Sequence, residues 1–260
     1  MPIKDGQGYS DNTPQKQEFL ETIVSTHLNI VQRIISKHSS SYNFYQWIDL
    51  NSGCGINPNC IGSPFVFLNA VRNRKMAWIA HFIDINNYLC KELHQNIFIN
   101  YLDIIGQCIT HNGDNAVIGK QIIQDIPSCG KQVYGMIYSD ENGEVNFDAL
   151  AEISKLNNAH KIDFLIHIGA TALKRVNGVY KNRYKLTDSM KLIKKKHWLV
   201  REPYGKNQWT FLLGTNWDYF PEFKSRGFFN SNSKEGIEIL TRLNYTQSEL
   251  NSGLTLQENE

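Results

Sequence analysis

The sequence lacks several features that would assign a protein quickly to a class. It has no run of about eighteen apolar residues, which a membrane-spanning helix would need. Its five cysteines are odd in number and form no Cys-x-x-Cys pair, so we expect neither a disulfide framework nor a bound metal. The formal net charge of +2 does not indicate a strongly polyanion-seeking surface.

The N-terminus, MPIKDGQGYSDNTPQKQEF, also lacks the charged-then-apolar layout of a signal peptide. We therefore expect a cytoplasmic protein without membrane contact. With 260 residues and 41% apolar residues, the chain is long enough for one large domain. We expect a disordered N-terminus over 1–12, the main domain with its N-terminal helix over 13–215, an aromatic segment and helix over 216–246 packed on that domain, and a flexible tail over 247–260.

Strand patterns alternate with helix patterns along the chain. Apolar residues from Phe19 to Ile35 recur at helical spacing behind Thr13-Pro14, which predicts a long amphipathic first helix. Ser63-Pro64 predicts the start of a second helix, with Ser63 as its N-cap. Seven segments read as strands: 44–50, 76–84, 106–114, 132–140, 161–169, and the two arms of a hairpin around Gly205 that we expect at the edge.

This alternation predicts an α/β protein with a Rossmann-like, doubly wound sheet of about seven strands, the last pair antiparallel. An N-terminal helix precedes the sheet, and a helical extension capped by Ser233 closes the chain. Folds of this kind bind ligands at the carboxyl ends of their strands. The residues that follow each strand are therefore the first place to look for a site.

The first strand ends in the turn Asp49-Leu50-Asn51-Ser52-Gly53-Cys54-Gly55. Glycines there let the backbone approach a ligand closely, although a tight turn without a ligand fits the same residues. The second strand ends in Asp84, whose carboxylate is suited to accept both hydroxyls of a ribose or to cap a helix. The third ends in Asp114-Asn115, which is suited to accept from the exocyclic amine of an adenine.

These strand ends resemble the class I S-adenosylmethionine-dependent methyltransferases. The resemblance spans about residues 44 to 215. It implies S-adenosylmethionine as the cofactor. Asp49, Gly53 and Gly55 would line its methionine part, Asp84 its ribose, and Asp114 with Asn115 its adenine. Asn51 belongs to the same expected cofactor site.

A narrower resemblance is to the three-Cys-motif partner family. The motifs are SGCG at 52–55, the GSP helix start at 62–64 and DENG at 140–143, where that family has AGPG, GSP and DPxG. The family is methyltransferase-like and is found among mobile or defence genes. It implies a protein partner in a larger assembly as well as a cofactor.

The fourth strand ends in Asp140-Glu141-Asn142-Gly143. In methyltransferases that act on base amines, an Asp or Asn at this place accepts hydrogen bonds from the target amine, so Asp140 and Asn142 are the candidate catalytic residues. In those enzymes two prolines and an aromatic residue follow the Asp or Asn, and these residues are missing here. A polar β-turn explains the four residues equally well.

Three residues near the fifth strand are candidates for substrate binding: His167, Lys174 and Arg175. A histidine on an apolar strand is otherwise a satisfied core residue. The lysines of KLIKKKHW at 191–198, with nearby aromatic residues, suit phosphate contacts and base stacking, or they merely solvate a helix end. The aromatic segment WDYFPEFKSRGFF at 217–229 predicts a loop that folds back over the core or forms a lid.

The sequence therefore favours a methyltransferase that acts on a base amine of DNA or RNA. The resemblance to the three-Cys-motif partner family implies a defence, phage or mobile-element context. A non-catalytic partner subunit with a retained pocket, and a small-molecule methyltransferase, remain as alternatives.

Overall fold

The structure, a computed structural model, describes residues 3–4, 7–8, 13–37, 43–57, 60–126, 133–141, 145–179, 185–206, 208–218 and 221–245. Within these ranges no helix combines the length and the apolar character needed to cross a membrane. The strands are β1 (Ile3–Lys4), β2 (Gln7–Gly8), β3 (Phe44–Asp49), β4 (Ile56–Asn57), β5 (Cys60–Ile61), β6 (Trp78–Asp84), β7 (Cys108–Asn112), β8 (Val133–Ser139), β9 (Ile162–Gly169), β10 (His197–Arg201), β11 (Trp209–Thr215) and β12 (Phe228–Asn230).

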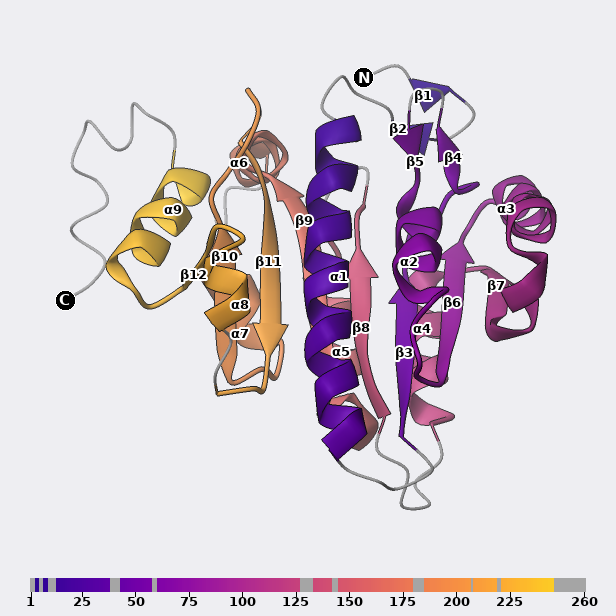
Figure 1. Ribbon diagram of the computed structural model, residues 1–260. Coiled ribbons are helices and arrows are strands. Elements are labelled where there is room, and N and C mark those ends of the chain that lie inside the picture. Colours follow the sequence, from indigo (N-terminus) through magenta and orange to yellow (C-terminus); the bar gives the residue numbers. More distant parts are fainter. Residues whose placement is uncertain are drawn as a thin grey trace.

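Eight of these strands form one sheet in the order β12-β10-β11-β9-β8-β3-β6-β7 (Figure 1). The five strands from β9 to β7 are parallel, whereas β11 runs antiparallel to both of its neighbours. The Rossmann-like, doubly wound sheet is thus confirmed. All five predicted parallel strands form, within two residues of the predicted boundaries.

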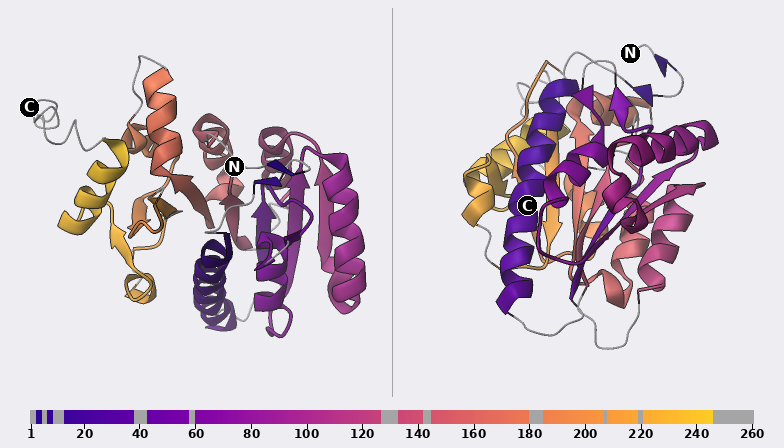
Figure 2. Two further views of the ribbon diagram at one scale, coloured as in Figure 1. Left: turned by 90° about the horizontal axis from the view of Figure 1, so that it is seen from above. Right: turned by 45° about the vertical axis from the view of Figure 1, so that its right-hand side comes forward.

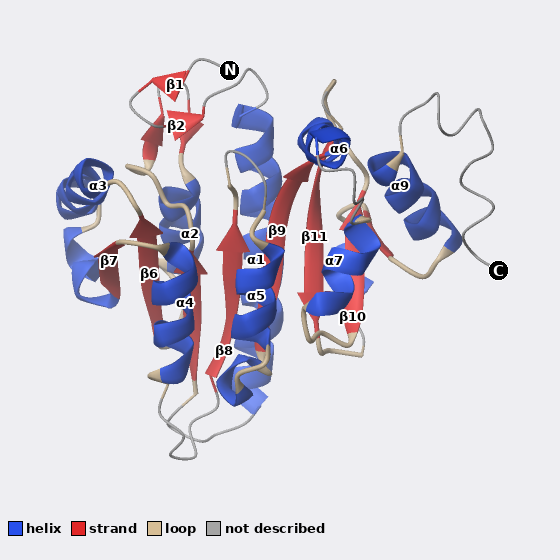
Figure 3. Cartoon of the chain, turned by 180° about the vertical axis from the view of Figure 1, so that it is seen from behind, coloured by secondary structure: helices blue, strands red, loops and turns tan. Residues whose placement is uncertain are grey.

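Helices cover both faces of this sheet. They are α1 (Thr13–Lys37), α2 (Ser63–Val71), α3 (Asn87–Asn100), α4 (Asn115–Gln124), α5 (Phe147–Ser154), α6 (Ala170–Val179), α7 (Leu186–Leu192), α8 (Pro221–Lys224) and α9 (Lys234–Asn244), with 3₁₀ turns η1 (Leu102–Gln107) and η2 (Asn157–Ala159). Figure 1 shows α1 and α2 in front of the sheet, and Figure 3 shows α4, α5 and α7 on the other face. The view from above in Figure 2 shows the sheet between these layers.

Strand β3 lies at the centre of the sheet and carries buried apolar residues on both faces. Tyr45 and Trp47 belong to the core beneath α1 and α2, and Ile48 belongs to the core beneath α4 and α5. Trp47 stacks on Phe67 of α2 at a centroid distance of 4.8 Å. Burial on both faces is what a central strand of a parallel sheet requires, and it places the end of β3 in the middle of the sheet edge.

Helix α1 is anchored to the sheet by a buried polar group. The His27 side chain is fully buried, with Nδ1 at 2.9 Å from the Tyr45 hydroxyl and Nε2 at 3.1 Å from Asp163 Oδ2. Its ring stacks on Trp217 at 5.4 Å. These contacts fix the angle at which α1 crosses the sheet, and hence where its first turns lie.

The C-terminal part of the sheet differs from two predictions. The hairpin β10–β11 is not at the edge, because β11 lies between β9 and β10. The segment 217–229, predicted as a loop, contains α8 and β12, and β12 pairs with β10 as an eighth strand. Phe223 and Phe228 of this segment are buried in the main core, which accounts for part of its aromatic content.

Candidate active site

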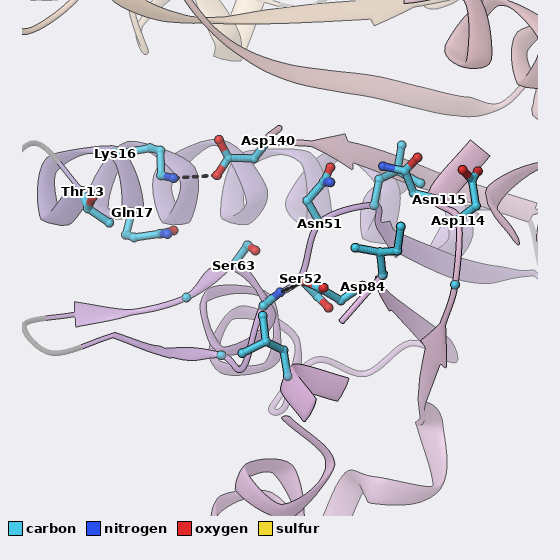
Figure 4. A pocket seen from close by; sticks show the side chains of 17 residues that line it. Thr13, Lys16, Gln17, Asn51, Ser52, Ser63, Asp84, Asp114, Asn115 and Asp140 are labelled. Carbon is cyan, nitrogen blue, oxygen red and sulfur yellow. Dashed lines mark hydrogen bonds and ion pairs between the residues drawn. The ribbon is translucent and has the colours of Figure 1, made fainter. Parts of the chain in front are cut away.

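A pocket of about 310 Å³ opens where β3, β6, β7 and β8 end (Figure 4). Four separate strand ends and the first turn of α1 contribute to it. Its lining residues are Thr13, Lys16, Gln17, Leu50, Asn51, Ser52, Gly53, Gly55, Gly62, Ser63, Asp84, Ile85, Leu89, Gly113, Asp114, Asn115 and Asp140.

The turn after β3 forms the floor of this pocket. Gly53 and Gly55 have φ angles of 60° and 77°, which residues other than glycine rarely adopt. A Cβ atom on Gly55 would lie 2.8 Å from Leu93 Cδ1. Gly55 therefore allows the close packing of the turn on α3.

The short hairpin β4–β5 separates this turn from α2. The Gly62 amide donates to the Gly55 carbonyl at 2.8 Å, which returns the chain to the turn. Gly62, and not Ser63 as predicted, is the N-cap of α2, and no side chain caps this helix. Ser63 is the first helical residue and faces the pocket.

Asp49 lies under the turn and does not line the pocket, in contrast to the expected contact with a ligand. Its Oδ1 accepts from the Asn51 amide at 3.2 Å. Burial raises the pKa of Asp49 to about 7, against the lowering effect of the Ser63 hydroxyl and the Asn51 amide. Asp49 therefore shapes the turn from below.

Asp84 joins two of the strand ends. Its Oδ2 accepts from the Gly53 amide at 3.0 Å, and its Oδ1 accepts from the Asn86 amide at 2.8 Å. It does not cap α3, because Asn86 does so. Each oxygen of the Asp84 carboxylate retains further acceptor capacity toward the pocket that it lines.

Asp114 and Asn115 reach the same pocket from the end of β7. Asp114 is the N-cap of α4, and its Oδ1 accepts from the amides of Ala116 and Val117 at 2.9 and 3.0 Å. The structure thus brings Asn51, Gly53, Gly55, Asp84, Asp114 and Asn115 together around one space. Whether they bind a cofactor stays a prediction.

Asp140 follows β8 at the opposite end of the pocket and is held by two partners (Figure 4). Its Oδ2 accepts from Lys16 Nζ at 2.5 Å, and its Oδ1 lies 2.9 Å from His167 Nδ1. His167 Nε2 in turn lies 2.8 Å from the Tyr204 hydroxyl. We call the group of Lys16, Asp140, His167 and Tyr204 the Asp140 relay.

The relay keeps Asp140 ionised. Burial alone would raise its pKa, but the charge of Lys16 and the hydrogen bond from His167 lower it far below the ordinary value. Burial lowers the pKa of His167 and raises that of Tyr204. At neutral pH the relay therefore presents a fixed carboxylate.

The remaining predicted residues are less close to the pocket. His167 contacts Asp140 but does not line the pocket. Lys174 is half-buried on α6, which starts directly after β9; Arg175 lies on the same helix, but its side chain is outside the described part of the structure. Asn142 also lies outside the described residues.

The lysine run at 194–196 is not beside the pocket. It precedes β10, which is parallel to β9 because both run antiparallel to β11. The run therefore lies at the amino ends of the parallel strands, whereas the pocket lies at their carboxyl ends.

Helix α1 provides a part of the site that was not predicted from the sequence. Thr13, Lys16 and Gln17 share one face of its first turns and line the pocket. Gln17 Oε1 is buried and has no hydrogen-bond partner among the described residues, and the same is true of Asn51 Oδ1. The signal was the i, i+3, i+4 spacing of polar residues on an otherwise amphipathic helix.

Comparison with known proteins supports the fold. No protein-family model matches the chain, and neither does any curated protein. Among solved structures, protein LPL1258 from Legionella pneumophila superposes with a TM-score of 0.51 and 12% identity, over 80% of this chain and 89% of that one.

Two structures described as methyltransferases are similar at lower scores. The DszA carbon methyltransferase has a TM-score of 0.49 and 10% identity, over 81% of this chain and 56% of that one. An O-methyltransferase from Bacillus cereus, in complex with SAH, has a TM-score of 0.47 and 10% identity, over 81% and 83%. At 12% identity the similarity to protein LPL1258 shows the fold alone, which is the doubly wound α/β sheet described above.

Proposed function

We propose that this protein is an S-adenosylmethionine-dependent methyltransferase. The observation that carries the proposal is the convergence of Gly53, Asp84, Asp114 and Asp140 on one pocket. Three carboxylates in this lining face a single lysine, Lys16, so the pocket favours a ligand with positive charge and several hydrogen-bond donors.

The pocket lining fits S-adenosylmethionine on features of this structure. Asn51 Oδ1 and Gln17 Oε1 are buried acceptors without partners among the described residues, and such groups are stabilised by a ligand's N–H or O–H donors. Asp84 would accept from the ribose hydroxyls, and Asp114 with Asn115 would face the adenine. The cofactor, when bound, supplies an electrophilic methyl group.

Asp140 is the residue that we assign to the methyl acceptor. Held by Lys16 and His167, it remains an anion in a site where its side chain is only 18% exposed. A fixed carboxylate accepts a hydrogen bond from an approaching amine and aligns its nitrogen without reorganising. Trp209, which meets Gly169 at the end of β9 and packs edge-on against His167 at 5.5 Å, offers a stacking surface nearby.

These groups support an amine of a nucleic-acid base as the acceptor. Labelled methyl transfer from S-adenosylmethionine to unmethylated DNA and RNA tests this. We expect incorporation that Asp140→Ala abolishes while affinity for S-adenosylhomocysteine is retained. Asp188→Asn, which changes an exposed acid on α7, should behave as the wild type. Incorporation that Asp140→Ala leaves intact, or labelling of small molecules alone, would contradict the assignment.

One observation favours a second function, that of a non-catalytic partner subunit that binds the cofactor. Both oxygens of Asp140 already accept hydrogen bonds, from Lys16 and from His167. This suits a subunit that only binds the cofactor, because such a subunit needs no free acceptor for a substrate amine. Saturable binding of S-adenosylhomocysteine without methyl transfer to any nucleic acid is the result that this alternative predicts.

A further inference from the structure

A second pocket lies on the opposite side of the sheet from α1. It has a volume of about 350 Å³ and sits between the second half of α4 and strands β3, β6 and β7, where Figure 3 shows α4 in front of the sheet. It shares no lining residue with the candidate active site. Its lining residues are Phe44, Gln46, Ile79, His81, His111, Ile118, Gln121, Ile122, Asp125 and Ile126.

The walls of this pocket are mostly apolar. Four isoleucines and Phe44 form them, whereas Gln121 on α4 and Asp125, the C-cap of that helix, are exposed. Pockets of this character, at the small end of the usual size range, accept compact ligands with a large apolar surface. Asp125 is the only acidic or basic residue of the lining besides the two histidines.

Gln46 is the residue that the fold does not explain. It is 3% exposed on the central strand β3, between Phe44 and Ile48 on the same face. Its Oε1 is buried and has no hydrogen-bond partner among the described residues. An unsatisfied buried acceptor destabilises the protein, so its presence in a pocket indicates a donor on a ligand.

Neither histidine of the lining forms a hydrogen bond with Gln46 Oε1, and the two bond to each other. His81 Nδ1 lies 2.9 Å from His111 Nε2, and the rings stack at 5.2 Å. Burial lowers the pKa of both, that of His81 to about 4, so the pair is uncharged at neutral pH.

From these contacts we infer that the pocket beneath α4 is a second ligand site, which binds a neutral, planar heteroaromatic molecule of about two fused rings through an N–H donated to Gln46 Oε1. The apolar walls take up the ring faces, and the neutral histidine pair forms one side. The inference goes beyond the proposed methyl transfer and does not depend on it.

The test compares two probes of the same shape. Indole carries one N–H, and 1-benzofuran has an oxygen in its place. Calorimetric titration of the wild-type chain should show indole binding about five- to a hundredfold more tightly, the range expected for one donor on a buried acceptor. Amide chemical shifts on addition of indole should change at β3, β6, β7 and α4.

Two variants sharpen the comparison. Gln46→Leu should give both probes the same affinity, whereas Gln121→Leu, at the exposed rim, should keep the preference for indole. If Gln46→Leu does not fold, the comparison on the wild type still decides. Equal binding of the two probes to the wild type, no binding of indole, or shift changes elsewhere would overturn the inference.

Discussion

The ion pair between Lys16 and Asp140 gives the sharpest prediction of stability. The side chains are 11% and 18% exposed, and Nζ lies 2.5 Å from Oδ2. Two charges about 4 Å apart attract by about 4 kcal/mol at an effective dielectric constant of about 20. Removing one partner of a fully buried pair costs about 3–5 kcal/mol.

Because water reaches both side chains in part, we expect Lys16→Met to lower the free energy of unfolding by about 2–3 kcal/mol at pH 7. Urea unfolding, followed by circular dichroism, measures this value. Lys191→Met is the matched control, since Lys191 pairs with Asp188 at 78% and 49% exposure and the same substitution there should have little effect.

The pH dependence of this ion pair follows from the direction in which the pKa of Asp140 is shifted. The folded pKa of Asp140 is depressed, so the stabilisation is present above the unfolded value near 4 and is lost as the pH falls below it. The difference between wild type and Lys16→Met should therefore shrink in acid. If Lys16→Met and Lys191→Met have the same free energy of unfolding at pH 7, the ion pair between Lys16 and Asp140 does not stabilise the contact between α1 and the end of β8.

Three further predictions concern the turn, the histidine pair and the anchor of α1. Gly55→Ala should lower the free energy of unfolding by about 2 kcal/mol because of its φ of 77° and the contact with Leu93, whereas Gly106→Ala, with open space around it, should be neutral; thermal unfolding compares them, and equal effects would refute the argument. Burial lowers the pKa of His81 from 6.5 to about 4, so only the unfolded chain binds a proton at this residue between these pH values. The free energy of unfolding should therefore fall by about 3 kcal/mol from pH 7 to pH 4 through His81. His81→Phe should remove this contribution, and an unchanged dependence of stability on pH in that variant would contradict the prediction. His27→Ala should destabilise by about 3 kcal/mol, because it leaves a cavity and the Asp163 carboxylate without its histidine partner, and chemical unfolding that shows less than 1 kcal/mol would refute this role.

The parallel strands were predictable because local patterns determine them. The runs 44–50 and 161–169 are apolar on both faces, and each ends in a polar or glycine-bearing turn, so the strand ends and the residues that follow them could be read directly. That is why six of the predicted cofactor residues line one pocket. Asp49 differs, since alternation along β3 does not say whether the last residue faces the ligand or the core.

The Asp140 relay could not be predicted, because it joins distant parts of the chain. Lys16 and Asp140 are 124 residues apart, and their contact depends on how α1 crosses the sheet. The angle of α1 rests on tertiary contacts of His27 and Trp217. Strand β12 was missed because three residues in an aromatic segment carry no usable alternation.

Calorimetric titration of the purified protein with S-adenosylmethionine and S-adenosylhomocysteine, with NAD as the control ligand, decides whether the pocket binds a methyl donor. We expect saturable micromolar binding of both sulfur compounds, lost in Asp84→Asn and kept in Asp188→Asn, with no comparable binding of NAD. Absence of binding by either sulfur compound, or equal binding of NAD, would contradict the assignment of the pocket as a methyl-donor site.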